Sequence, residues 1–166
     1  MKYDCFCGKG IELSKRERTL CLNESVIFCS PECLLSYLKT LQKEGGFNFE
    51  KWNVKIKKAH LTAPTEYWDF YTGRFFRSKY EAVVSKFLLQ NGFKYVYEPY
   101  VLSTDKVKMY IPDFFVLGLN LFIEVKGLWK GGSKKKVKEI IKNTNGALIV
   151  LPSYLQKQLE KFVNQN

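Results

Sequence analysis

The chain has 166 residues and a formal net charge of +11, with 27 basic side chains against 16 acidic ones. This length can bury one core with a small appendage, and a composition that is 46% hydrophobic excludes a disordered or fibrous protein. No apolar run approaches the roughly 20 residues of a membrane span, and the first residues form no apolar signal segment. We therefore expect an intracellular protein, neither secreted nor membrane-bound, whose positive charge favours an anionic partner such as nucleic acid.

The charge and the cysteines divide the chain into three parts. Residues 1–43 hold all five cysteines and a net charge of +2, and we interpret them as a small separate module. Residues 44–76 form an aromatic-rich connecting segment with a net charge of +1. Residues 77–166 carry +8 and should contain the main domain. A site for a polyanion is therefore expected in the last part.

The elements expected in the first module are two strands and one helix. Residues 18–22 and 26–29 resemble short strands around a polar turn. Ser30-Pro31-Glu32 predicts a helix start, with Ser30 as N-cap, and Gly45-Gly46 predicts its end.

The connecting segment has weak periodicity. Residues 51–58 favour either a strand or an irregular connection, and the lone His60 is expected at the surface. Aromatic side chains such as Trp52, Trp68 and Phe70 are expected to pack on neighbouring elements, with stacking on nucleic-acid bases as the alternative.

The last part gives a clear order of elements. Ser78 and Glu81 have the spacing of a capping box, and Asn91-Gly92 ends the helix that follows. Strands are predicted over 93–102, 108–116, 121–126 and 147–151, a helix capped by Ser133 runs to about residue 143, and a terminal helix begins at Ser153. This order predicts an α/β (α+β) fold with a mixed sheet flanked by helices.

Two acidic side chains and one lysine are expected to meet on the hairpin formed by the second and third of these strands. Strand alternation places Glu124 and Lys126 on one face, and the short turn allows Asp113 to come opposite them. Two carboxylates about 4 Å apart repel by about 4 kcal/mol at an effective dielectric near 20. Lys126 offsets part of this repulsion, and a hard cation such as Mg²⁺ would offset more. The alternative is an ordinary exposed strand face with a Glu–Lys pair.

Pro112-Asp113, ten further residues and then Glu124-Val125-Lys126 resemble the signature of the PD-(D/E)XK nucleases. The resemblance extends over residues 77–151, where Glu81, Tyr97-Glu98 and Gly127 are also similar to the family pattern. It implies a restriction-endonuclease-like fold and hydrolysis of phosphodiester bonds in nucleic acid with Mg²⁺ or a similar ion.

The resemblance also implies roles for individual residues. Asp113 and Glu124 would hold the metal ion together with the carbonyl of Val125. Lys126 would orient the attacking water or stabilise developing charge, and Glu81 would assist a second metal ion or the water. Closing the capping box with Ser78 is the alternative for Glu81, and a buried partner to a lysine or tyrosine is the favoured reading of Glu98.

A group of lysines directly follows this hairpin and could bind phosphates without regard to sequence. The DNA-binding candidates are Lys130, Lys134, Lys135 and Lys136, with Lys138 beside them. Trp129 could stack on a base or pack against the protein. For each lysine alone, a solvated helix face is the alternative.

Cys5-Phe6-Cys7-Gly8 and the later Cys29 to Cys33 segment at a helix start can supply four thiolates to a structural Zn²⁺. The layout resembles treble-clef zinc fingers, whose knuckles usually place two residues between the first cysteines, where this chain has one. Cys21 is therefore the reserve ligand, or else a small core residue. A segment of about 43 residues rarely folds on hydrophobic burial alone, and zinc would supply the missing stability.

The first hypothesis is a Mg²⁺-dependent endonuclease that cuts DNA inside the cell. The small size resembles phage or mobile-element enzymes of the homing, recombination or junction-resolving types, and a homodimer would suit cleavage of both strands. A non-catalytic nucleic-acid-binding protein on a nuclease-like fold is the alternative, and a zinc-dependent adaptor is the third. RNA satisfies the charge pattern as well as DNA does.

Overall fold

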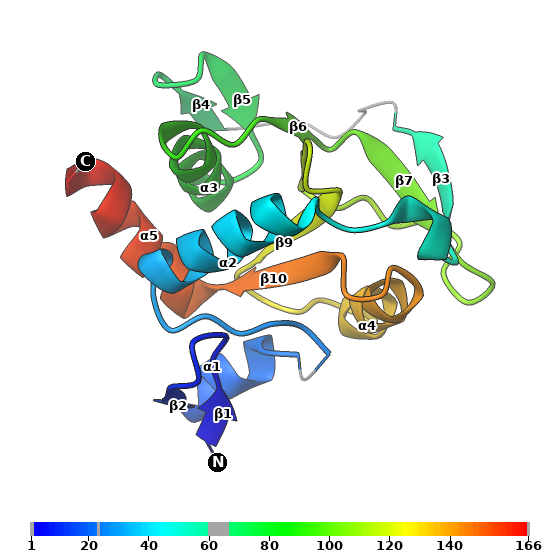
Figure 1. Cartoon of the computed structure of the whole chain (residues 1–166), viewed down its shortest axis with the longest axis horizontal. Helices are drawn as coiled ribbons and strands as arrows, with labels where there is room; N and C mark the ends of the chain where they lie inside the picture. Colours follow the sequence, from blue (N-terminus) through cyan, green and yellow to red (C-terminus); the bar gives the residue numbers. More distant parts are fainter. Residues whose placement is uncertain (1, 23, 60–66, 166) are drawn as a thin grey trace.

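The computed structural model describes residues 2–22, 24–59 and 67–165, so His60 lies outside the described residues. Figure 1 shows a central sheet with helices packed around it. The elements in chain order are β1 (Lys2–Asp4), β2 (Gly10–Glu12), α1 (Lys15–Leu20), α2 (Pro31–Glu44), the 3-10 helix η1 (Phe49–Lys51), β3 (Lys55–Lys58), β4 (Tyr67–Asp69), β5 (Arg74–Phe76), α3 (Lys79–Gln90), β6 (Tyr95–Tyr97), β7 (Tyr100–Ser103), β8 (Phe114–Val116), β9 (Leu121–Lys126), α4 (Ser133–Asn143), β10 (Leu148–Pro152) and α5 (Ser153–Gln165). Within the described ranges, no helix combines the length and the hydrophobicity that crossing a membrane requires.

The main sheet has four strands in the order β10-β9-β8-β6. β10 runs parallel to β9, whereas β8 is antiparallel to both β9 and β6. The mixed sheet and the α+β class predicted from the order of elements are therefore confirmed. Three further pairs, β1-β2, β3-β7 and β4-β5, form small two-stranded sheets beside it.

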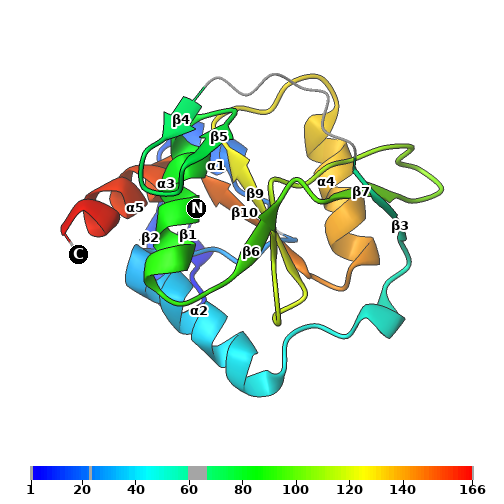
Figure 2. The same ribbon diagram turned by 90° about the horizontal axis from the view of Figure 1, so that it is seen from above.

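The two faces of the sheet pack against different helices. Helices α2, α3 and α5 lie on one side and α4 on the other (Figure 2). Phe114 and Ile123 point into the first core, and Phe115 and Phe122 point into the second, as strand alternation requires. The first core also contains Cys5, so the N-terminal segment shares its hydrophobic interior with the sheet.

Several helix boundaries follow the sequence signals. Ser30 caps α2 by accepting a hydrogen bond from the Cys33 N–H, and Gly45 ends the helix in the left-handed conformation with φ of 84°. The predicted cap of α4 is wrong by one residue, because Gly132 occupies the N-cap and Ser133 accepts a hydrogen bond from the Lys130 N–H instead. The core face of α4 consists of Val137, Ile140 and Ile141.

The two strands predicted in the first module are wrong. Residues 15–20 form helix α1, because Ser14 and Glu17 make a complete capping box that starts a helix. Residues 26–29 run without regular structure into α2. The hairpin of this module is instead β1-β2, which encloses Cys5 and Cys7 in its turn.

The predicted strands 93–102 and 108–116 are interrupted. Glu98 has a φ of 44°, which separates β6 from β7. Regular pairing of the later segment begins only at Phe114, and Tyr110 forms an isolated bridge to Leu102.

The connecting segment contains β3, which settles the open alternative for residues 51–58 in favour of a strand over its second half. Trp52 packs on Phe122 as expected, with ring centroids 5.6 Å apart. Phe70 does not pack into the core and is 92% exposed at the tip of the β4-β5 hairpin.

Candidate active site and thiolate cluster

Asp113 and Glu124 lie opposite each other at the same end of the sheet. Phe114 of β8 pairs with Ile123 of β9, so the next pair outward brings Asp113 against Glu124. Lys126 lies two residues further along β9, on the same face as Glu124. The hairpin thus assembles the two carboxylates and the amine that the sequence predicted to meet.

Glu124 is a buried carboxylate, 3% exposed, with a donor for each oxygen. The ammonium of Lys126 donates to one oxygen, and the hydroxyl of Tyr110 donates to the other at 2.5 Å. Burial raises the pKa of Glu124, while the ammonium of Lys126 acts in the opposite direction. The two donors hold the carboxylate in one orientation at the end of the sheet.

Asp113 is held by the backbone of the neighbouring strand. One of its oxygens accepts a hydrogen bond from the Val125 N–H at 2.6 Å, and its own carbonyl accepts one from the Glu98 N–H at 2.8 Å. Burial raises the pKa of Asp113 well above its usual range, and the negative charges of Glu124 and Glu81 raise it further. Such crowding of negative charge favours a bound cation.

Glu81 faces the same pair from the first turn of α3, where it is 7% exposed. Its carboxylate accepts hydrogen bonds from the Ser78 hydroxyl at 2.8 Å, the Arg77 N–H at 3.0 Å and the Tyr97 hydroxyl at 2.5 Å. Glu81 therefore serves the capping arrangement at the start of α3 and also lies near enough to raise the pKa of Asp113. The two readings of this residue are compatible.

We call Glu81, Asp113, Glu124 and Lys126 the carboxylate site. Sequence reasoning did not single out Tyr110, and it noted Tyr97 without a role, although each phenol donates to one of the two glutamates. Tyr110 stands before a break in the strand, so residue spacing does not show which side chain it meets. The signal that the sequence offers for this contact is the position of Tyr110, two residues before Pro112-Asp113.

Glu98 does not join the carboxylate site. It is 1% exposed and forms an ion pair with Arg77. Glu98 is a buried ion-pair residue, as expected, but it pairs with an arginine rather than with a lysine or tyrosine.

The candidate DNA-binding lysines divide into two groups. Lys130, Lys135 and Lys136 are exposed, as expected of a surface that meets phosphates. Lys134 instead donates to the Thr19 carbonyl at 3.0 Å, and Lys138 pairs with Glu24 at 2.8 Å. These two lysines fasten α4 to the N-terminal segment.

Trp129 lies beside the carboxylate site. Its ring centroid is 5.6 Å from the ammonium of Lys126, a cation–π distance. The indole is half-buried. This contact favours packing on Lys126 and still leaves part of the indole open to solvent.

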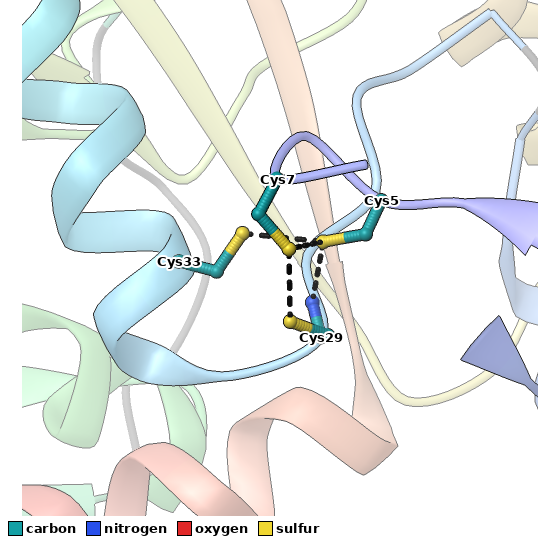
Figure 3. A group of neighbouring side chains, drawn as sticks. All are labelled: Cys5, Cys7, Cys29 and Cys33. Atoms are coloured by element: carbon teal, nitrogen blue, oxygen red, sulfur yellow. Dashed lines mark hydrogen bonds between the residues drawn. The ribbon is translucent and has the colours of Figure 1, made fainter. Parts of the chain in front are cut away.

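The thiolate cluster consists of Cys5, Cys7, Cys29 and Cys33. Figure 3 shows the four sulfurs pointing toward one another, Cys5 and Cys7 from the β1-β2 turn and Cys33 from the first turn of α2. The four Sγ atoms all lie within 4.8 Å of one another, with contacts of 3.2, 3.4 and 3.5 Å. A tetrahedron with Zn–S bonds of about 2.3 Å separates its sulfurs by about 3.8 Å, so the group has the size of a four-thiolate metal site.

The single residue between Cys5 and Cys7 does not keep either thiol out of the cluster. The turn closes tightly, because the Gly8 N–H donates to the Cys5 carbonyl at 2.8 Å and Gly8 adopts a φ of 80°. Cys21, the reserve ligand, lies outside the cluster and is buried, which raises its thiol pKa to about 11. The alternative reading of Cys21 as a small core residue fits its position.

Comparisons with known proteins agree on one family. The model of the phage endonuclease I family matches residues 63–151, more than half of the chain. Endodeoxyribonuclease 1 of Enterobacteria phage T3 is 46% identical over 68 residues, which cover 39% of this chain and 43% of that protein. Endonuclease I of Escherichia phage T7 is 43% identical over 65 residues, or 37% of this chain and 42% of that protein.

The alignments span less than half the length of these curated relatives. No solved structure matches the chain. The match of the family model contains the complete carboxylate site, whereas the thiolate cluster lies before it. On this match, the chain belongs to the phage endonuclease I family.

Proposed function

We propose that this protein is a metal-dependent endodeoxyribonuclease of phage or mobile-element type, with PD-(D/E)XK chemistry on a restriction-endonuclease-like sheet. The observation that carries the proposal is the placement of Asp113 opposite Glu124, with Lys126 at the end of the same strand. The proposal is supported by the two relatives named as endonucleases, which align with part of this chain. Homing, recombination and junction resolution are the biological roles it would suit.

The donor set fits Mg²⁺. Asp113, Glu124 and the carbonyl of Val125 would hold the ion, since hard cations prefer oxygen ligands. The raised pKa of Asp113 reflects crowded negative charge that a cation would relieve. The ion, when bound, would stabilise charge on the scissile phosphate and make a water more acidic.

The remaining groups act on the substrate from fixed positions. Lys126 pairs with Glu124 and would turn toward the phosphate or the attacking water when a cation takes over the charge of Glu124. Glu81 would assist from α3. Tyr110 and Tyr97 would keep the two glutamates aimed, because each donates a hydrogen bond to one carboxylate.

The thiolate cluster is proposed to bind one structural Zn²⁺, since four thiolates make a closed site without an open position for substrate. The module of residues 1–43 would then stabilise the main domain as well as contact DNA. The Tyr154 hydroxyl donates to the Phe28 carbonyl at 2.9 Å, and the Val150 N–H donates to the Ser25 hydroxyl at 3.1 Å. Both contacts tie the segment beside the cluster to β10 and α5.

DNA would reach the carboxylate site across the exposed lysines Lys130, Lys135 and Lys136, which supply sequence-independent affinity. We include in the proposal a homodimer that places two carboxylate sites on one substrate, acting inside the host cell. The mass of the purified protein by light scattering tests the dimer, and a monomer at the concentrations that support cleavage would contradict it.

The test of the enzymatic function uses supercoiled plasmid and branched DNA, each with Mg²⁺ or with EDTA. We expect wild type to cut in Mg²⁺ and not in EDTA, and Asp113→Asn and Lys126→Ala to bind DNA without cutting it. If wild type and both variants bind but are equally inert, a non-catalytic nucleic-acid-binding protein is the correct reading.

A further inference from the structure

A cavity of about 590 Å³ is lined in part by the residues that precede Glu81 and follow Lys126 in the chain. Its walls come from α1, the start of α3, the loop after β9 and the start of α5. The volume falls within the range of about 300–1,000 Å³ that is common for small-molecule pockets.

Two residues that line the cavity are sequence neighbours of carboxylate-site residues. Tyr80, which lines it, directly precedes Glu81, and Gly127, which also lines it, directly follows Lys126. Because consecutive Cα atoms are about 3.8 Å apart, the wall formed by Gly127 lies within one nucleotide's length of Lys126.

The lining has the mixed character of a nucleotide site. Lys130 and Lys157 contribute two exposed ammonium groups, and Glu17 contributes one carboxylate. Hydrogen bonds from the side chain and backbone of Ser14 lower the pKa of Glu17, and the charge of Lys157 adds to this effect, which places Lys157 near Glu17. The net charge of these three groups is positive, as a phosphate requires.

The apolar part of the lining can accept a sugar and a base. Tyr80 and Tyr154 are half-buried aromatic residues. Leu128, two residues before Lys130, is 59% exposed. Aromatic rings stack on bases without regard to sequence. Glu17 offers an acceptor to an exocyclic amino group at the same place.

The cavity is built jointly by two parts of the chain. Tyr80, Leu128 and Lys130 lie within the segment matched by the family model, whereas Glu17, Tyr154 and Lys157 lie outside it. The Tyr154 hydroxyl is fixed on the Phe28 carbonyl, next to Cys29 of the thiolate cluster. Residues of the N-terminal module and of α5 thus complete a wall that the family segment alone does not have.

From this arrangement we infer that the cavity binds one nucleotide of the DNA strand next to the scissile phosphate. Lys130 and Lys157 hold its phosphate, and the aromatic walls hold its sugar and base. The inference rests on the proposed nuclease function and adds a substrate contact contributed by residues beyond the family segment.

Photo-crosslinking tests the inference directly. The cleavage position is first mapped, and 5-iododeoxyuridine is then placed one nucleotide at a time within two positions on either side of it. We expect irradiation of the wild-type complex to crosslink one flanking position to Tyr80 or Tyr154, as identified by mass spectrometry. Crosslinks that map outside the cavity, in a protein that cuts the same DNA, overturn the inference.

A charge variant gives a second readout. Lys157→Ala should raise the KM for DNA about 3- to 10-fold and reduce the salt slope of binding by about one. Lys161→Ala is the matched control, because Lys161 is exposed on the same helix as Lys157 and does not line the cavity.

The outcomes separate the two proposals. If wild type cuts DNA while Lys157→Ala behaves like Lys161→Ala, the cavity inference is wrong and the nuclease function stands. If wild type fails to cut any DNA, the nuclease function is wrong, and the cavity inference falls with it.

Discussion

The carboxylate site and the thiolate cluster are held together in different ways. Asp113 directly precedes β8, Glu124 lies on the paired strand β9, and the N–H and O–H groups that donate to their carboxylates belong to the protein itself. The four cysteines come from a turn, an irregular segment and a helix start, and their sulfurs lie within 4.8 Å of one another. The first site is positioned by the fold, whereas the second is expected to depend on its metal ion.

The largest expected effect breaks the carboxylate site alone. Asp113→Asn keeps an acceptor for the Val125 N–H but removes the charge that would bind the cation. We expect the single-turnover cleavage rate to fall at least about 10³-fold, or about 4 kcal/mol, with the zinc content and the fold retained. A rate within tenfold of wild type would show that Asp113 holds no catalytic ion.

The next effect breaks the thiolate cluster alone. Cys33→Ser removes one of four thiolates at the start of α2. We expect loss of bound zinc and a fall in stability of at least about 3 kcal/mol, which for this size of chain lowers the melting temperature by about 6–12 °C. Zinc is measured by mass spectrometry of the metal, and melting by circular dichroism.

Cys21→Ser is the matched control for this variant. Cys21 is buried but lies outside the cluster, so its replacement should keep one zinc per chain and cost about 1 kcal/mol. Equal zinc loss in both variants would contradict the assignment of ligands, and full zinc retention by Cys33→Ser would contradict the site itself.

A smaller effect sharpens the role of the partners around Glu124. Tyr110→Phe deletes one hydroxyl donor, leaves the ring in the core and frees one oxygen of Glu124. We expect cleavage to slow about tenfold, or about 1.4 kcal/mol. The Mg²⁺ concentration for half-maximal activity should rise, because a Glu124 carboxylate that is no longer held in place binds the ion less tightly. Calorimetric titration with Mg²⁺ gives the same shift without turnover.

Tyr100→Phe controls for the loss of a phenol in the same core. Its ring packs on Phe115 with centroids 5.4 Å apart, and within the described part of the chain its hydroxyl makes no hydrogen bond. Cleavage and Mg²⁺ affinity should stay at the wild-type level. Equal losses in both variants would show that Tyr110 acts by packing and does not position Glu124.

The contrast between the two regions also explains what the sequence could predict. Strand β9 was predicted with its bounds, because an apolar alternating run between turns has few other solutions. Helix α1 differs from the predicted strand because the capping box of Ser14 and Glu17 outweighs the short apolar run of residues 18–22. In the same module, the Ser30 cap and the Gly45 end of α2 follow the local signals.

The candidate site follows the same division. Asp113, Glu124 and Lys126 could be placed together because strand alternation and a short hairpin dictate their faces. Tyr110 could not be assigned to Glu124, because the chain leaves regular pairing between residue 110 and β8. The cavity beside the site depends on how α1 and α5 pack, which no spacing in the sequence encodes.

The smallest predicted effect concerns pH and separates charge from packing at the carboxylate site. Burial, with the charges of Glu124 and Glu81, raises the pKa of folded Asp113 above its value of 3.8 in the unfolded chain. Folding is therefore favoured below that value, and this stability is lost as the pH rises through the folded pKa.

Without added Mg²⁺, Asp113→Asn should melt about 2–4 °C above wild type at pH 8, which corresponds to about 1 kcal/mol. The two melting temperatures should be equal near pH 4. Added Mg²⁺ should stabilise wild type and leave the variant unchanged, because the ion neutralises a charge that asparagine lacks. A difference in melting temperature that is the same at both pH values would show that Asp113 matters through packing and not through its charge.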